Sequence, residues 1–178
     1  TVVGVVNADT LLNFPDFRSN ERAFNMLEQV AGRAGRRQDK GTVVIQTANP
    51  KHEVLQFVKN HDYAGFYENE IADRSRFAYP PFTKVIVIYL KNLDDVACDR
   101  AAVILTMALR KVFGDRILGP EKPFVSRISR YYLQSIMLKV EAGASMKKVK
   151  DLLRSILASI ASEQDVKTST IYYDVDPV

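Results

Sequence analysis

The four residues Tyr79-Pro80-Pro81-Phe82 divide this sequence of 178 residues into two different patterns. Neither proline has a backbone N–H to donate, and each restricts its own backbone and that of the residue before it. Regular structure is therefore interrupted at this stretch, and we place a domain boundary there. We expect three regions, residues 1–50, 51–82 and 83–178.

The region after the boundary is predicted to contain a sheet and two helices. The run Val85–Tyr89 is typical of a buried strand, and apolar residues at helical spacing follow it from Asp94 to Phe113. The predicted order is β-α-β-β-α-β, the ferredoxin-like arrangement, with two helices on one face of an antiparallel sheet. The remaining elements expected are a strand over 123–130, its hairpin partner over 131–140, a helix from Ser145 and a strand over 168–175.

The region before the boundary has a different organisation. The apolar run at residues 1–6 indicates a strand, a loop follows to Ser19, a helix begins near Asn20, and residues 43–47 form a second apolar run. Strand, helix and strand in this order are typical of part of an α/β lobe. Residues 51–82 are predicted to be a helical connector. Because the chain opens without methionine inside an apolar run, we expect a fragment of a larger protein.

Composition and charge narrow the class of protein. Hydrophobic residues make up 47% and charged residues 26%, which is typical of a globular protein. The single cysteine excludes a disulfide within the chain and a cysteine zinc site. No signal peptide or apolar run of membrane-spanning length is present, so we expect a cytoplasmic location and no membrane partner. The net charge of +4 arises entirely after residue 82.

The motif QVAGRAGR, residues 29–36, suggests a site for an anion. Gln29, Arg33 and Arg36 are spaced so that a helix places them on one face. Gly32 and Gly35 leave room for a ligand near the backbone, and arginine is well suited to bind phosphate. The alternative is a helix that frays into a glycine-containing turn with solvated arginines. Spacing alone does not choose between the two.

The predicted hairpin suggests a second site. Basic and aromatic side chains cluster there, a combination that suits single-stranded DNA because cations contact phosphates and rings stack on bases. The alternative is that half of the tyrosines in this region and on the last strand pack into the core, and that the arginines form a solvated rim. The candidate DNA-binding residues are Arg127, Arg130, Tyr131, Tyr132 and Lys139.

Several motifs together resemble one family of enzymes. QVAGRAGR is similar to motif VI of superfamily 2 helicases, Q-x-x-G-R-x-G-R, and the stretch from Val3 to Asp9 is similar to motif V. Together with further matching positions, they resemble the primosomal protein N′ (PriA) family of replication-restart DNA helicases. The other residues that carry this resemblance are Phe14–Arg18, Glu21, Arg22, Asp62, Tyr63, Phe66, Tyr67, Glu70, Arg74, Tyr79–Phe82, Leu118–Pro120 and Asp174–Pro177.

The resemblance implies roles for individual residues. Arg36 matches the motif VI arginine that reaches the γ-phosphate of ATP and stabilises charge during phosphoryl transfer. Arg33 would be its companion at the nucleotide, and Gln29 would help to join the ATP and DNA states. Asp9, with the glycines at 32 and 35, would couple the nucleotide site to the DNA backbone.

The resemblance also implies an activity, cofactors and partners for the larger protein. That protein would be a bacterial, cytoplasmic 3′-to-5′ DNA helicase that uses ATP and Mg²⁺ to restart stalled forks, with zinc bound outside this chain. Its partners would be branched and single-stranded DNA, single-stranded-DNA-binding protein and other primosome proteins. Residues 1–50 would be the tail of the second RecA-like lobe, and residues 83–178 a DNA-binding domain similar to ribosomal protein S10.

The sequence also departs from the family pattern and leaves one rival open. It contains no G-x-x-x-x-G-K-[ST] phosphate loop, so we expect this chain alone to bind no cofactor and to hydrolyse no ATP. The rival is a ferredoxin-like module for protein docking or dimerisation, without DNA affinity of its own. An apolar free sheet face would favour docking, whereas a basic face with exposed tyrosines would favour DNA.

Overall fold

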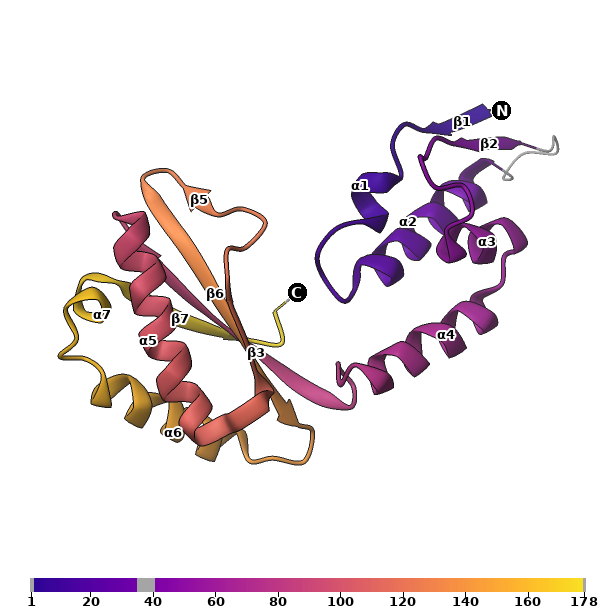
Figure 1. The fold of residues 1–178 in the computed structure, drawn as a ribbon. Coiled ribbons are helices and arrows are strands. Elements are labelled where there is room, and N and C mark those ends of the chain that lie inside the picture. Colours follow the sequence, from indigo (N-terminus) through magenta and orange to yellow (C-terminus); the bar gives the residue numbers. More distant parts are fainter. Residues whose placement is uncertain (1, 35–40, 178) are drawn as a thin grey trace. The chain divides into compact units, whose positions relative to one another are not determined.

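The computed structural model describes residues 2–34 and 41–177, and its contacts divide the chain into two compact units. Unit 1 comprises Thr1–Phe77 and unit 2 comprises Ala78–Val178. Both units mix helices with strands, as the sequence predicts (Figure 1). The division lies directly before Tyr79-Pro80-Pro81-Phe82. The helices of residues 51–77 belong to the same unit as the first 50 residues.

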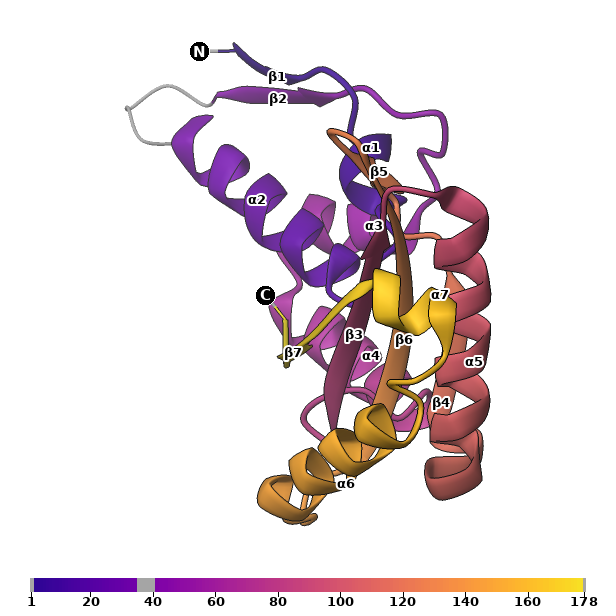
Figure 2. The ribbon, with the colours of Figure 1, turned by 90° about the vertical axis from the view of Figure 1, so that its left-hand side faces the viewer.

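Unit 1 is a short parallel strand pair with helices packed against it. β1 pairs in parallel with β2, and Figure 2 shows α2 and α3 on one side of the pair. A short helix, α1, occupies part of the segment predicted to be a loop, which corrects that prediction. The elements are β1 (Val2–Val5), α1 (Asp9–Leu12), α2 (Ser19–Ala34), β2 (Thr42–Ile45), α3 (Glu53–Asn60) and α4 (Tyr63–Arg76).

Aromatic packing holds the helices of unit 1 together. The rings of Phe24 on α2 and Phe66 on α4 stack with centroids 4.2 Å apart, and both side chains are buried. Asp62 begins α4 as its N-cap, because its carboxylate accepts a hydrogen bond of 2.9 Å from the Gly65 N–H. The same core includes Val54 and Leu55 of α3. The helices of residues 51–77 are therefore packed into unit 1 and do not form a free linker.

Unit 2 has the β-α-β-β-α-β order with two short additions, β5 and α7. Its helices are α5 (Asp95–Phe113), the 3₁₀ helix η1 (Gly114–Arg116), α6 (Met146–Ser159) and α7 (Gln164–Thr168). Its strands are β3 (Thr83–Asn92), β4 (Ile117–Glu121), β5 (Arg127–Ile128), β6 (Tyr131–Glu141) and β7 (Thr170–Val175).

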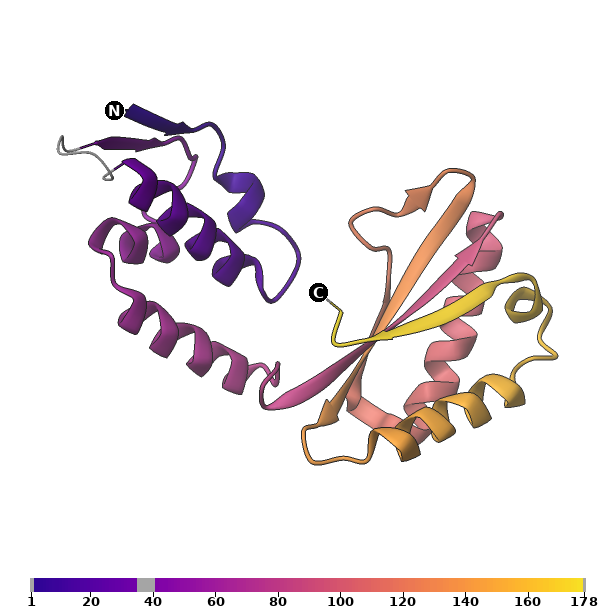
Figure 3. The same ribbon diagram turned by 180° about the vertical axis from the view of Figure 1, so that it is seen from behind.

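The sheet of unit 2 is antiparallel, with the strand order β4-β6-β3-β7 and with β5 paired to β6. The longest ladder joins β3 to β6, from the pair Thr83–Glu141 at one end to Asn92–Tyr132 at the other. Figure 3 shows α5 and α6 on the same face of these strands. The other face, which we call the open face, carries Val85, Val87, Tyr89 and Lys91 of β3.

The strand before the hairpin differs from the prediction. Residues 117–121 form β4 themselves, whereas the predicted strand over 123–130 is reduced to the two residues of β5. β4 lies at the edge of the sheet, where Pro120 is tolerated because an edge position does not require its missing N–H. Gly119 has φ +98°, and a Cβ there would lie 3.0 Å from the Ser135 carbonyl oxygen. Glycine is therefore required at this position.

The helix-covered face of the sheet forms the core of unit 2. Ile86, Ile88 and Leu90 of β3 meet Leu105 and other apolar residues of α5, and all are buried. One continuous core therefore forms from apolar residues at every second strand position and apolar residues at helical spacing. Cys98 is fully buried in this core, and burial raises the pKa of its thiol. It acts as a small apolar residue.

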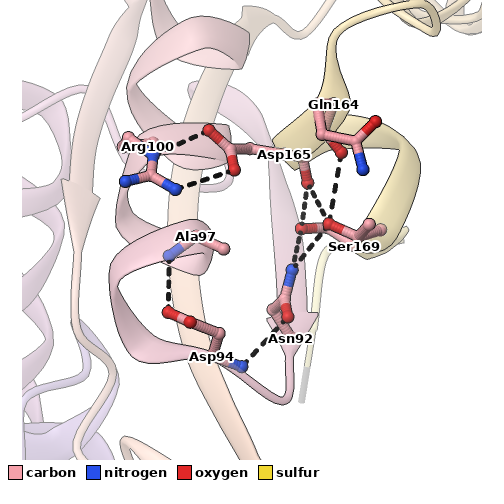
Figure 4. Close-up of polar contacts among 8 residues, drawn as sticks. Asn92, Asp94, Ala97, Arg100, Gln164, Asp165 and Ser169 are labelled. Atoms are coloured by element: carbon pink, nitrogen blue, oxygen red, sulfur yellow. Dashed lines mark hydrogen bonds and ion pairs between the residues drawn. The ribbon is translucent and has the colours of Figure 1, made fainter.

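A polar cluster fixes the end of β3 to the start of α5 and to α7 (Figure 4). The Asn92 side-chain amide donates to the Ser169 hydroxyl at 2.9 Å, and its oxygen accepts from the Asp94 N–H at 3.0 Å. Asp94 in turn accepts from the Ala97 N–H at 2.9 Å, so it is the N-cap of α5. Nearby, Arg100 forms two hydrogen bonds with Asp165.

Replacement of Asp94 by alanine is expected to lower the free energy of unfolding of unit 2 by about 1 kcal/mol, because it removes the N-cap of the central helix. Asparagine caps a helix about as well as aspartate, so the Asp94→Asn variant should stay close to the unchanged protein. Urea denaturation of the three proteins measures this difference. Equal losses in the two variants would show that the charge matters and the cap does not.

Candidate nucleic-acid interface

The β5–β6 hairpin presents the candidate DNA-binding residues at one end of the sheet. Arg127 pairs with Tyr132 and Ile128 with Tyr131 in the antiparallel ladder. Ser129 has φ +56°, the left-handed conformation that a tight hairpin turn requires. The pairing therefore sets Arg127 opposite Tyr132, and the hairpin lies at the top of β6 in Figure 1.

Cations lie against the hairpin tyrosines. The Arg127 guanidinium carbon is 5.0 Å from the Tyr132 ring centroid, and that of Arg130 is 5.6 Å from the Tyr131 centroid. Both arginines are exposed, whereas both tyrosines are half-buried. The rings therefore support guanidinium groups that remain accessible to a phosphate.

Lys91 of β3 joins this group, although it was not among the residues predicted from the sequence. Its ammonium nitrogen lies 5.3 Å from the Tyr131 ring centroid. The sequence pattern that could have identified Lys91 is its position two residues after Tyr89, because residues at every second position point to the same face of a strand. Lys91 shares the open face with Tyr89. Its pairing with Leu133 of β6 places Lys91 close to the hairpin.

The tyrosines of unit 2 divide between the two faces of the sheet. Tyr132 and Tyr173 pack against the buried core, as the core-packing alternative expected for some of them. Tyr89 and Tyr172 stack on the open face with ring centroids 5.3 Å apart, and Tyr172 is 46% exposed. The open face is mixed, because buried Val87 lies beside these rings.

Lys139 does not lie with the other hairpin residues. It pairs with Val85 near the opposite end of the ladder, and its ammonium nitrogen lies 3.6 Å from the Tyr79 ring centroid. Burial lowers the pKa of its ammonium group. The predicted set of five residues is thus separated in the structure, four at the hairpin and Lys139 near the start of β3.

Motif VI is only partly within the described residues. Gln29 and Arg33 lie exposed in the last turns of α2, where their spacing puts them on one helix face. Gly32 is exposed, and a Cβ added there would meet nothing within 4 Å. Packing within the described residues therefore does not explain this glycine. Gly35 and Arg36 lie outside the described residues.

Asp9 connects the ends of the two strands of unit 1. Its carboxylate accepts hydrogen bonds from the Thr47 hydroxyl at 2.6 Å and from the Ala48 N–H at 2.9 Å. These bonds lower the pKa of Asp9. Thr47, which was not predicted from the sequence, fixes this carboxylate beyond the end of β2. The structure thus shows Asp9 in an architectural role at the carboxyl ends of the two strands.

Glu70 and Arg74, which contribute to the family resemblance, form an ion-pair cluster with Glu21. Arg74 donates to Glu70 at 3.0 Å and to Glu21 at 2.7 Å. Burial raises the pKa of Glu70, and the hydrogen bond from Arg74 opposes that shift. The cluster joins α4 to α2 inside unit 1.

Metal-binding clusters and membrane-spanning helices are both absent from the described residues. Within residues 2–34 and 41–177, no three histidine, cysteine or acidic side chains gather in a way that could hold a metal ion. No helix in this part of the chain is long and apolar enough to cross a membrane.

The sequence matches known proteins over nearly all of its length. Residues 75–178 match the family described as the primosomal protein N C-terminal domain. Proteins named replication restart protein PriA from Synechocystis, Bacillus subtilis and Treponema pallidum are similar to this chain. Each is 35% identical to it over an alignment that covers 99% of the chain. The chain covers 20%, 22% and 26% of these relatives, so it spans about a fifth to a quarter of their length.

Proposed function

Because the chain belongs to the family of the primosomal protein N C-terminal domain, whose members here are replication restart proteins, we propose that it supplies a replication restart helicase with a DNA-binding domain and with motif VI arginines. The hairpin carries the first part of this proposal. Its two exposed arginines are held on tyrosine rings, where they can contact phosphates of branched or single-stranded DNA.

The topology of the two units supports the finer fold assignment. We assign unit 2 to the ferredoxin-like class, similar to ribosomal protein S10, on its β-α-β-β-α-β order and on the strand order β4-β6-β3-β7. We assign the part of unit 1 up to residue 50 to a RecA-like lobe. The support is a parallel strand pair joined through α2, with Asp9 and Thr47 beyond the carboxyl ends of the strands.

The second part of the proposal concerns ATP. Arg36 would reach the γ-phosphate, with Arg33 and Gln29 as its companions at the nucleotide. A phosphate loop and the residues that hold Mg²⁺ would come from another part of the protein, because this sequence contains no such loop. Hydrolysis there would drive 3′-to-5′ movement along DNA in the bacterial cytoplasm, with single-stranded-DNA-binding protein and primosome proteins as partners. Zinc, too, would be bound outside this chain.

Fluorescence anisotropy with labelled forked, single-stranded and blunt duplex DNA tests the hairpin. The Arg127→Ala/Arg130→Ala variant should bind more weakly at low salt. It should also show a shallower dependence of affinity on salt, by about 0.7 to 0.9 in the logarithmic slope for each phosphate that the variant no longer neutralises. The matched control is Lys147→Ala/Lys148→Ala, which removes two exposed positive charges from α6.

Two results would contradict the DNA proposal. The first is an absence of binding by the unchanged chain even at low salt. The second is an equal loss in the α6 control, which would show that only net charge matters.

A second candidate function, protein docking, is favoured by apolar side chains beside the hairpin. Phe124 is 75% exposed and Ile128 is 56% exposed. Exposed apolar side chains of this size occur at contact surfaces between proteins. Loss of DNA binding in the arginine variant would separate this candidate from the first, because docking through apolar groups does not depend on those arginines.

A further inference from the structure

We propose that a basic cavity at the far end of the β3–β6 ladder from the hairpin binds a backbone phosphate of nucleic acid, as a second contact on unit 2. The proposal rests on the DNA-binding function proposed above and extends it to a new site. The cavity has a volume of about 720 Å³. It is lined by Ala78, Thr83, Lys139, Glu141 and residues 110–116.

Three elements meet around this cavity and bring positive charge together. Arg110 and Lys111 come from the last turn of α5, Arg116 from η1, and Lys139 from β6. Two acidic residues, Asp115 and Glu141, also line it, so that four positive charges face two negative ones. The cavity is therefore suited to an anion.

Existing contacts hold part of this charge in place. The Arg116 guanidinium lies 2.6 Å from the Glu141 carboxylate, and Arg110 donates to the Gly119 carbonyl oxygen at 3.1 Å. These two side chains are thereby oriented at the rim. Lys111 is exposed at the end of α5, where a positive charge also complements the helix dipole.

Lys139 is the most confined cation of the cavity. Its ammonium nitrogen lies over the Tyr79 ring, and burial lowers the pKa of this group. An ammonium group that has lost part of its hydration gains more from an incoming anion than a fully hydrated one does. The position of Lys139 therefore adds to the case that the cavity receives a negatively charged group.

The position of the cavity on β6 favours nucleic acid as the source of that group. Tyr131 at the hairpin and Lys139 at the cavity are eight positions apart on one strand and point to the same face. Eight strand residues span about 26 Å. Phosphates along one strand of B-form DNA are about 3.4 Å apart along the axis, so roughly eight nucleotides span this distance if the strand stacks as it does in B-form DNA. One nucleic-acid strand could thus contact both ends of the ladder.

A length series of single-stranded DNA tests this proposal. The variant is Lys111→Ala/Lys139→Met, which removes two charges but keeps an apolar stem against Tyr79. Oligonucleotides of about 4 nucleotides reach only one site, so the hairpin should bind them about equally in both proteins. Oligonucleotides of about 12 nucleotides or more should bind the variant on the order of tenfold more weakly, with a salt slope reduced by about 0.7 for each phosphate that is no longer bound.

The controls keep this proposal separate from the hairpin proposal. Lys147→Ala/Lys148→Ala removes the same number of lysine charges from α6 and should leave the affinity for long strands nearly unchanged. Lys111→Glu alone alters only an exposed side chain, so it tests the cavity even if the double variant fails to fold. Circular dichroism checks the fold of each protein.

Three outcomes decide the matter. If long strands bind the cavity variants as tightly as the unchanged chain while the hairpin variant binds weakly, the cavity proposal fails and the proposed function stands. If no DNA binds the unchanged chain at any length, the proposed function fails and the cavity proposal fails with it. If the variants lose affinity for a short acidic peptide and keep their DNA affinity, the cavity is a protein-binding site and the proposal is overturned.

Discussion

Replacement of Arg36 by alanine is expected to lower the rate of ATP hydrolysis by about 10³-fold or more in a complete helicase that carries this chain. The physical reason is that an arginine at the γ-phosphate stabilises charge that spreads over the transferred group in the transition state. Because that contact strengthens in the transition state, kcat should fall far more than the KM for ATP rises.

A chimera makes this measurement possible. The segment of the Bacillus subtilis relative that matches this chain, 35% identical over 179 residues, would be replaced by residues 1–178. DNA-stimulated ATP hydrolysis would then be compared for the chimera and its Arg36→Ala variant. Arg37→Ala is the matched control, because it removes a neighbouring arginine that is not part of the motif. Equal losses in the two variants would contradict the assignment of the arginine finger to Arg36.

The second large effect is expected in the core of unit 2. Leu105 lies on α5, is fully buried, and packs among the apolar residues of β3 and β6. Leu105→Ala should lower the free energy of unfolding by about 2–5 kcal/mol, since it removes apolar contacts and leaves a cavity. Met107, two residues further along the same helix, is 63% exposed, so Met107→Ala should change stability by less than about 0.5 kcal/mol.

Chemical denaturation of the whole chain measures both variants. Because the chain has two units, hydrogen exchange of the β3 and β6 amides gives the local reading for unit 2. If Met107→Ala lowered the free energy of unfolding as much as Leu105→Ala, the opposite face of α5 would be the buried one. Unchanged exchange in Leu105→Ala would contradict the packing of α5 on the sheet.

Strong local patterns were enough to predict most of unit 2. Residues Val85–Ile88 are buried, Tyr89 is half-buried, and the predicted helix start at Asp94 is the observed N-cap. The buried face of α5 was predicted less well. The helical spacing of Ala97, Ala101, Ile104, Ala108 and Val112 would place Val112 on the buried face. Val112 is 49% exposed, because the buried stripe follows the larger residues Leu105 and Leu109. Small alanines fit either face, so their spacing alone could not fix the orientation of the helix.

Other features depended on tertiary context. β4 contains Gly119 and Pro120, residues that argue against a strand unless the strand lies at an edge, and edge position is not visible in the sequence. α7 has only five residues, too few to show helical periodicity. The separation of Lys139 from the hairpin also required the ladder, because the length of β6 decides how far apart its two ends lie.

The long β3–β6 ladder, with β7 on the other side of β3, has a consequence for how the protein is made. β3 is synthesised first, yet its neighbours β6 and β7 begin about 40 and 80 residues after it ends. At about 5–20 residues per second, the ribosome delivers β7 roughly 4–16 s after β3. During that interval the most apolar strand of the sheet lacks at least one neighbour. Chaperone contact with the nascent chain should therefore concentrate on residues 83–92.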